Sequence, residues 1–161
     1  MKILLKNRLL LLPAVLALIP LTACGGSDST GPGGQRNAPN SITVLADSTL
    51  KDAFTQIGSQ FEAQNSGKTV NFTFGSSSAL AQQAVAGDPG DVLTTADQAD
   101  MNSTQKVQFD SPQLFASKGS ATYAIATLTQ SKNTSLSQQF INFVTTQPGQ
   151  KILLQDGFGP P

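Results

Sequence analysis

The segment Asn71–Gln83, NFTFGSSSALAQQ, decides the fold, because it has the pattern of a strand that ends in a turn and then opens a helix. Val70, Phe72 and Phe74 alternate with polar residues, which is the period of a half-buried strand. The glycine that follows allows a turn, and Ser76–Ser78 are N-cap residues for an Ala/Leu/Gln helix. A helix start carries unpaired N–H groups and partial positive charge, so clustered hydroxyls there favour an anion. A well-capped helix without a ligand has the same pattern.

A second strand-to-helix junction of this kind precedes it. Ser41–Ala46, SITVLA, is a short and nearly continuous apolar strand, typical of a parallel sheet that is buried on both faces. Ser48 and Thr49 follow it and open a helix with apolar residues at helical spacing. In a parallel sheet both junctions would lie at the carboxyl edge of the strands, where open α/β sheets bind ligands. Two junctions at one edge favour an anion site over incidental caps.

A third short strand, Asp91–Thr95, ends at the same edge and leads into Ala96 and Asp97. We expect Asp97 to cap the next short helix and Asp91 to fix a turn or a neighbouring amide. A later apolar strand at 121–128 would return antiparallel to the others. The pattern therefore predicts an α/β fold: a single lobe with a central mixed, mostly parallel sheet of about five short strands, flanked by helices on both faces.

The N-terminus has the features of a cleavable export signal. Basic residues precede the apolar run Leu9–Leu21, which is too short and too proline-interrupted for a membrane span. The run ends at Cys24, the only cysteine of the chain, in a sequence that resembles a bacterial lipoprotein signal. We predict a signal peptide at 1–23, lipidation of Cys24, a flexible tether at 24–40 and one lobe at 41–161, so the protein would be extracytoplasmic and lipid-anchored to the cell membrane. An ordinary secretory signal with an incidental cysteine is the alternative.

Composition argues against several classes of function. The chain of 161 residues has 10 Lys and Arg, 10 Asp and Glu, no His and no Trp. Loss of the signal removes Lys2, Lys6 and Arg8 and leaves an acidic excess, so nucleic acid is not an expected partner. A hydrolase with Ser77 as nucleophile would lack a histidine base, and no Gly-x-Ser-x-Gly or Ser-x-x-Lys motif surrounds that serine. We expect no enzyme, no cofactor and no metal.

Several segments together carry a family resemblance. ITVLADSTLKDAFTQIGSQF at 42–61, FTFGSSSALAQQ at 72–83 and GDPGDVLTTADQADM at 87–101 resemble the first lobe of the periplasmic molybdate-binding proteins of ABC importers. The segment 122–161 resembles the C-terminus of the same family. The resemblance implies a type II periplasmic binding protein fold, in which two lobes enclose a tetrahedral oxyanion held by neutral hydroxyl and amide donors. It also implies capture of molybdate or tungstate for delivery to an ABC importer permease.

The resemblance assigns ligand-binding positions residue by residue. It implies that the first hydroxyl ligand is Thr49, where the family usually has serine, that the second is Ser77, and that a backbone N–H donor belongs to Ala96. Ser48 and Ser76 are adjacent and are candidates to share this work. Tyr123, the only tyrosine, falls on the returning strand and is not expected to be a ligand.

The chain departs from the family in length. In members of the family, the chain crosses from the first lobe into the second and back between the positions that match Met101 and Thr122. Here only residues 102–121 lie between those positions. A lobe needs roughly 100–120 residues, so we expect the second lobe to be deleted near 102–121. A lone lobe would leave the anion half in water and would bind it with reduced affinity. The alternative is a non-transporting surface lipoprotein or interaction module with a vestigial anion site, which could form a homodimer through an exposed face. A remnant of an internal deletion would look the same in sequence.

Overall fold

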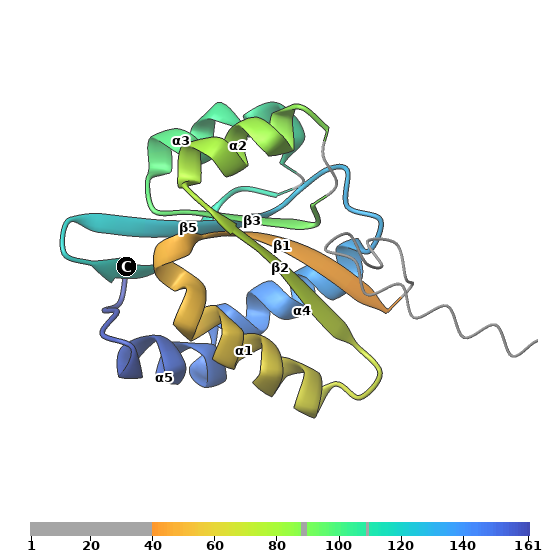
Figure 1. The fold of residues 1–161 in the computed structure, drawn as a ribbon, viewed down its shortest axis with the longest axis vertical. Coiled ribbons are helices and arrows are strands. Elements are labelled where there is room, and N and C mark those ends of the chain that lie inside the picture. The colour runs from red at the N-terminus through yellow and green to blue at the C-terminus, as the bar shows by residue number, and fades with distance from the viewer. Residues whose placement is uncertain (1–39, 88–89, 109) are drawn as a thin grey trace, which may run out of the picture. The chain divides into compact units, whose positions relative to one another are not determined.

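The computed structural model describes residues 40–87, 90–108 and 110–161 (Figure 1). The predicted signal peptide, Cys24 and almost all of the tether lie outside these residues. Among the residues that are described, no helix combines the length and apolar character needed to cross a membrane.

Five strands form one mixed sheet in the order β2-β1-β3-β5-β4. Their bounds are β1 Ser41–Asp47, β2 Thr69–Gly75, β3 Val92–Thr95, β4 Gln113–Lys118 and β5 Ala121–Thr127. β1 lies parallel to both β2 and β3, whereas β5 runs antiparallel to its neighbours β3 and β4. The prediction of a mixed, mostly parallel sheet with an antiparallel returning strand is confirmed.

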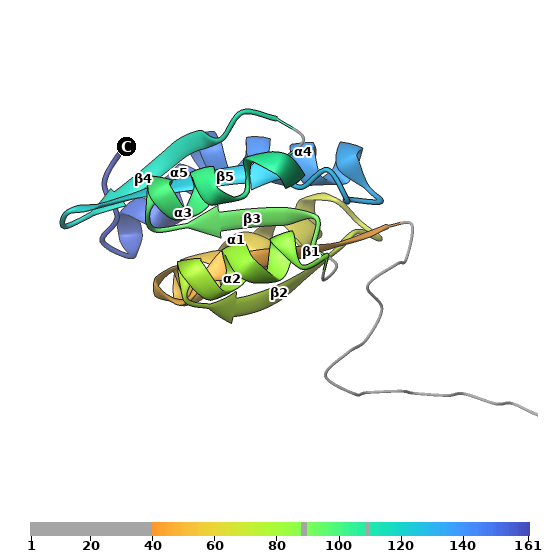
Figure 2. The same ribbon diagram turned by 90° about the horizontal axis from the view of Figure 1, so that it is seen from above.

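Helices cover both faces of the sheet (Figures 1 and 2). One face carries α1 Lys51–Gln64, α4 Thr134–Thr145 and α5 Gln147–Gln155, and the other carries α2 Ser77–Val85 and α3 Gln98–Ser103. Two short 3₁₀ turns complete the described elements, η1 Ser48–Leu50 between β1 and α1, and η2 Gln105–Val107 after α3. The structure therefore has the three-layer arrangement that the alternation of strands and helices predicts.

Aromatic packing between α1 and α4 makes the larger of the two apolar clusters. Phe140 is fully buried, and its ring meets Phe61 edge-on at 5.5 Å and Phe54 at 6.2 Å between centroids. α5 contacts α4 at the level of the backbone, since a Cβ on Gly149 would lie 2.5 Å from the carbonyl oxygen of Phe143. This face of the sheet is therefore covered by a close-packed core.

The alternation of side chains along β1 determines where its last residue points. Val44 and Ala46 pack in the cluster formed with α1, α4 and α5, whereas Leu45 packs in the cluster formed with α2 and α3. Successive side chains of a strand leave opposite faces. Asp47 has the same parity as Leu45, so its carboxylate leaves the sheet on the side of α2.

The segment 102–121 holds the end of α3, η2, β4 and a tight turn. Gly119 occupies that turn with a φ of 62°, a conformation that favours glycine. β4 and β5 are joined there as a hairpin, at the place where sequence analysis expects a second lobe to have been deleted. The deletion itself stays a prediction.

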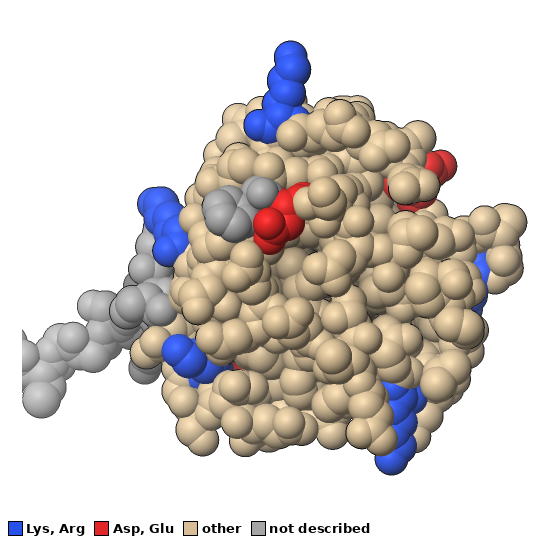
Figure 3. Space-filling model, turned by 180° about the vertical axis from the view of Figure 1, so that it is seen from behind, with Lys and Arg blue, Asp and Glu red and all other residues tan. Residues whose placement is uncertain are grey.

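Charges are sparse on the molecular surface. In Figure 3 the Lys, Arg, Asp and Glu side chains lie singly or in small groups on a mostly uncharged face. Among the described residues, Val85, Leu114 and Leu154 are the exposed large apolar side chains, and they belong to three different elements. Within the described residues, no three His, Cys, Asp or Glu side chains are grouped so that they could hold a metal ion.

Candidate anion site

The carboxyl ends of β1 and β3 and the start of α2 meet around one carboxylate. We name the group the Asp47 cluster; it comprises Asp47, Thr49, Ser77, Ala96 and Tyr123. Sequence analysis assigned three of these residues to the site, namely Thr49, Ser77 and Ala96, and the structure brings those three together. It adds the carboxylate of Asp47, which the sequence did not single out, and the phenol of Tyr123, which was not expected at the site.

Asp47 is the centre of the cluster and is 6% exposed. Its Oδ1 accepts hydrogen bonds from the Thr49 backbone N–H at 3.0 Å and from the Thr49 hydroxyl at 2.6 Å. Its Oδ2 accepts from the Ser77 backbone N–H at 3.1 Å and from the Ser77 hydroxyl at 2.5 Å. Two helix starts that are far apart in the sequence thus converge on one carboxylate.

Opposing effects act on the pKa of Asp47. Burial acts to raise the pKa, but hydrogen bonds from the side chains and backbones of Ser77 and Thr49 favour the charged form and bring the pKa below its ordinary value of 3.8. The carboxylate is therefore ionised at neutral pH.

Ser77 and Thr49 connect the carboxylate to two further strands. The Ala96 backbone N–H, just after β3, donates to the Ser77 hydroxyl oxygen at 2.8 Å. The hydroxyl oxygens of Tyr123 on β5 and Thr49 lie 2.9 Å apart. Since the single proton of the Thr49 hydroxyl goes to Asp47, Tyr123 is the donor in that pair. All these donors are electrically neutral groups.

Ser48 and Ser76 lie outside the cluster. Both are exposed, and Ser76 is the N-cap of α2, where its hydroxyl oxygen accepts the Ala79 N–H at 3.4 Å. Asp97 caps α3 by accepting the Ala99 N–H at 2.6 Å, as predicted. Asp91 accepts the Thr43 N–H at 2.7 Å, which is the amide-fixing role that the sequence indicates.

Sequence reasoning missed Asp47, and it named Tyr123 without placing it beside Thr49. A signal for Asp47 was available, because an acid that precedes a helix start is a common cap, and the alternation along β1 places it on the side of α2. Its partner Ser77 lies 30 residues away, and Tyr123 lies 74 residues from Thr49. These contacts depend on the order of the strands, which the local pattern does not contain.

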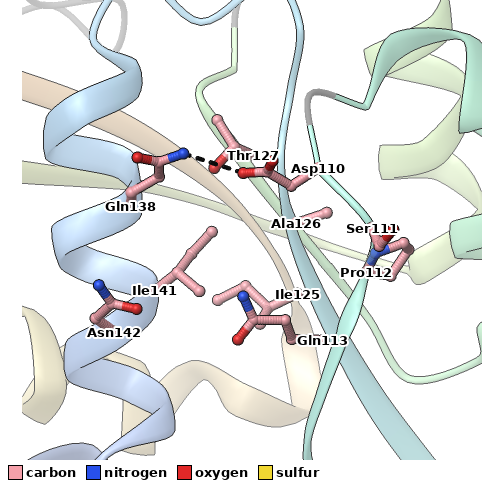
Figure 4. A pocket seen from close by; sticks show the side chains of 10 residues that line it. All are labelled: Asp110, Ser111, Pro112, Gln113, Ile125, Ala126, Thr127, Gln138, Ile141 and Asn142. Atoms are coloured by element: carbon pink, nitrogen blue, oxygen red, sulfur yellow. Dashed lines mark hydrogen bonds between the residues drawn. The ribbon is translucent and has the colours of Figure 1, made fainter.

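An open pocket of about 560 Å³ lies at the other end of β5 (Figure 4). Its polar rim includes Gln138 of α4, whose amide Nε2 donates to a carboxylate oxygen of Asp110 at 3.1 Å. The pocket reaches Thr127, which pairs with the first residue of β3, whereas the Asp47 cluster lies at the last residue of β3. The pocket and the cluster are therefore at opposite ends of the sheet.

Comparison with known families gives a match in the first part of the chain. Residues 42–116 match the model of the bacterial extracellular solute-binding protein family. This stretch contains every member of the Asp47 cluster except Tyr123.

Curated relatives are named molybdate-binding proteins. The molybdate-binding protein ModA of Mycobacterium tuberculosis is 44% identical over 96 residues, which cover 59% of this chain and 37% of that protein. ModA of Haemophilus influenzae is 38% identical over 55 residues, which cover 34% of this chain and 22% of that protein. The aligned part of the chain thus spans well under half the length of these relatives. Both names describe a binding protein and not an enzyme.

Solved structures with the same fold include binding proteins for different oxyanions. The periplasmic molybdate-binding protein of Azotobacter vinelandii aligns with a TM-score of 0.68 at 12% identity, covering 74% of this chain and 99% of that chain. The sulfate-binding protein SubI of Mycobacterium tuberculosis aligns with a TM-score of 0.63 at 14% identity, covering 75% and 87%. The fold is therefore that of a periplasmic binding protein lobe. Over residues 42–116 the chain is similar to the bacterial extracellular solute-binding protein family, and both ModA relatives carry the name molybdate-binding protein.

Proposed function

We propose that this protein is an extracytoplasmic solute-binding lipoprotein that takes a tetrahedral oxyanion, molybdate or tungstate, and presents it to an ABC importer permease. The observation that carries the proposal is the convergence of the Thr49 and Ser77 donors on a carboxylate. A donor set that holds the carboxylate of Asp47 has the spacing and polarity to hold oxygen atoms of an oxyanion. The names of the sequence relatives supply the choice of molybdate.

The ligand-binding residues in this proposal are Thr49, Ser77 and the N–H of Ala96. Tyr123 is buried and acts through its hydrogen bond to the Thr49 hydroxyl. Neutral donors suit a dianion because they leave no unpaired buried charge when the site is empty. Ser48 and Ser76 remain candidates to share this work, although the Ser76 hydroxyl already caps α2. Attachment through a lipid on Cys24 would keep the protein at the outer surface of the cell membrane.

We propose that affinity is low in comparison with a two-lobed binding protein. If a single lobe supplies all the donors, as predicted, the side of the anion that faces away from the sheet would be open to water, where each hydrogen bond contributes only about 0.5–1.5 kcal/mol net. Loss of several such bonds corresponds to a loss of several orders of magnitude in affinity.

The test is a titration of the purified protein with molybdate, tungstate, sulfate and phosphate, followed by calorimetry and by thermal unfolding. A ligand that binds the native state raises stability by about 2.7 kcal/mol at a hundredfold excess over its Kd. We expect a rise with molybdate and tungstate that needs high anion concentrations. A protein that melts cooperatively and responds to none of the four anions would contradict the proposal.

The second candidate is a surface lipoprotein that interacts with other proteins and has a vestigial anion site. The occupation of the donors by Asp47 favours it, because that arrangement needs no ligand to be satisfied. A homodimer belongs to this candidate. Light scattering of the purified protein distinguishes the two: a stable dimer without an anion response favours the interaction module, and an anion-responsive monomer favours the binding protein.

A further inference from the structure

We propose that the carboxylate of Asp47 is an internal competitor of the oxyanion, which occupies the donors that would hold the ligand and lowers the affinity of the site for dianions. The inference rests on the proposed function, in which the Asp47 cluster is the oxyanion site. It assigns to Asp47 a role in setting the affinity for the ligand and the dependence of that affinity on the ligand's charge.

The first argument is that the hydrogen bonds between Asp47 and its donors leave neither side with a free position. A carboxylate has about four acceptor positions, and all four are filled by Thr49 and Ser77, through one backbone N–H and one hydroxyl of each residue. Thr49 and Ser77 are also the two hydroxyl-bearing residues that the proposed oxyanion site depends on. An anion can gain their hydrogen bonds only when the carboxylate gives them up.

The second argument is the difference between donors that can turn and donors that cannot. The hydroxyls of Thr49 and Ser77 can rotate toward another acceptor. Their backbone N–H groups belong to η1 and to the first turn of α2, and both point at Asp47. A bound oxyanion would therefore have to take the place of the carboxylate and not lie beside it.

The third argument is charge. Asp47 is buried, and its neighbours in the cluster are neutral hydroxyl and amide groups. A dianion that took these donors would meet a carboxylate of the same sign at close range, and the repulsion between them would oppose binding. Asp47 would thus oppose binding even where it left some of the donors free.

The predicted loss of a second lobe and the presence of Asp47 would weaken binding in different ways. A missing lobe removes donors and burial, and no substitution within this lobe restores them. An internal competitor is removed by a single substitution. The two causes are therefore separable by experiment.

The experiment compares the wild-type protein with Asp47→Ala and Asp47→Asn by isothermal calorimetry with sodium molybdate and sodium tungstate. Asp47→Ala vacates the position, and Asp47→Asn keeps its size but removes its charge and two of its acceptor positions. The matched control is Asp97→Ala, which removes an exposed carboxylate at the same edge of the sheet that caps α3. We expect Asp47→Ala to bind at least tenfold more tightly than wild type, Asp47→Asn to gain less, and Asp97→Ala to remain within threefold of wild type.

Two outcomes separate the failure of this inference from the failure of the proposed function. Equal molybdate affinity in wild type and in both Asp47 variants would overturn the internal competitor and leave the oxyanion site standing. No binding in the wild type or in either Asp47 variant, all with native circular dichroism, would overturn both.

Folding of the variants provides a second readout. Removal of Asp47 leaves the Thr49 and Ser77 donors without an acceptor, so we expect Asp47→Ala to be destabilised and to recover melting temperature when millimolar molybdate replaces the carboxylate. If Asp47→Ala folds poorly, recovery of native circular dichroism on refolding with molybdate supports the inference. Failure of molybdate to restore it, together with no gain of affinity in Asp47→Asn, overturns it.

Discussion

Ser77→Ala provides a sharp test of the reasoning about the Asp47 cluster. The Ser77 hydroxyl donates to Asp47 at 2.5 Å and accepts the Ala96 N–H at 2.8 Å, and the residue is buried. Alanine removes both hydrogen bonds and adds nothing that could replace them. The Ser77 backbone N–H still reaches Asp47, so the carboxylate keeps three of its four donors.

The expected cost follows from the two bonds that are lost. A hydrogen bond to a charged group contributes about 1.5–3 kcal/mol, and a partly buried N–H without an acceptor costs about 1 kcal/mol. We therefore expect Ser77→Ala to lower the free energy of unfolding by about 3 kcal/mol. With a urea dependence of about 1.5 kcal/mol per M, the midpoint would fall by about 2 M.

The adjacent serine provides the matched control. Ser76 is exposed and caps α2 through a longer hydrogen bond of 3.4 Å. Ser76→Ala should cost about 0.5–1 kcal/mol, the lower part of the range for loss of an N-cap. Urea unfolding at pH 7, monitored by far-ultraviolet circular dichroism, measures both variants. A Ser77→Ala midpoint equal to or higher than that of Ser76→Ala would refute the reasoning.

The same pair of variants has a pH signature. Once Asp47 is protonated, the bond from Ser77 becomes an ordinary neutral one and contributes about 0.5–1.5 kcal/mol. The stability difference between wild type and Ser77→Ala should therefore shrink as pH falls below about 4. The difference for Ser76→Ala should stay constant, because that cap does not involve an ionisable group.

Three further predictions concern charge, packing and attachment. Hydrogen bonds keep the pKa of Asp47 below 3.8 in the folded state, so the stability that the ionised carboxylate contributes is present above that pH and is lost as pH falls through the folded pKa. Asp47→Asn should therefore flatten the acid side of a plot of urea midpoint against pH. An unchanged acid side would contradict this. Gly149→Ala should lower the free energy of unfolding by about 1–3 kcal/mol or more, because the new Cβ would lie 2.5 Å from the Phe143 carbonyl oxygen. The control Lys151→Ala, on the exposed face of α5, should change the urea midpoint little. Cys24→Ser should move the protein from the membrane to the soluble extracytoplasmic fraction and remove the acyl mass seen by mass spectrometry; equal membrane content of the two proteins would argue against lipidation.

Local patterns were sufficient for most of the fold. The alternation at 70–74, the serines at 76–78 and the apolar run at 41–46 are properties of short segments, and each predicted its element to within a residue or two. The parallel strands followed from strands that alternate with helices, and the cap formed by Asp97 followed from its place before α3. The family resemblance added Thr49, Ser77 and Ala96, and the structure brings these three together.

Only the tertiary structure decided what fills the site. The sequence by itself determined that two hydroxyl-bearing helix starts follow β1 and β2, because capping and periodicity act over a few residues. It did not determine that both starts point at Asp47, because that depends on the pairing of β1 with β2 in register, in which Asp47 lies opposite Gly75. The same holds for Tyr123, which reaches Thr49 only because β3 lies between β1 and β5. Contacts between strands that are distant in the chain depend on the order of strands in the sheet. Because of this order, the donors that sequence analysis expected to face an anion face the carboxylate of Asp47.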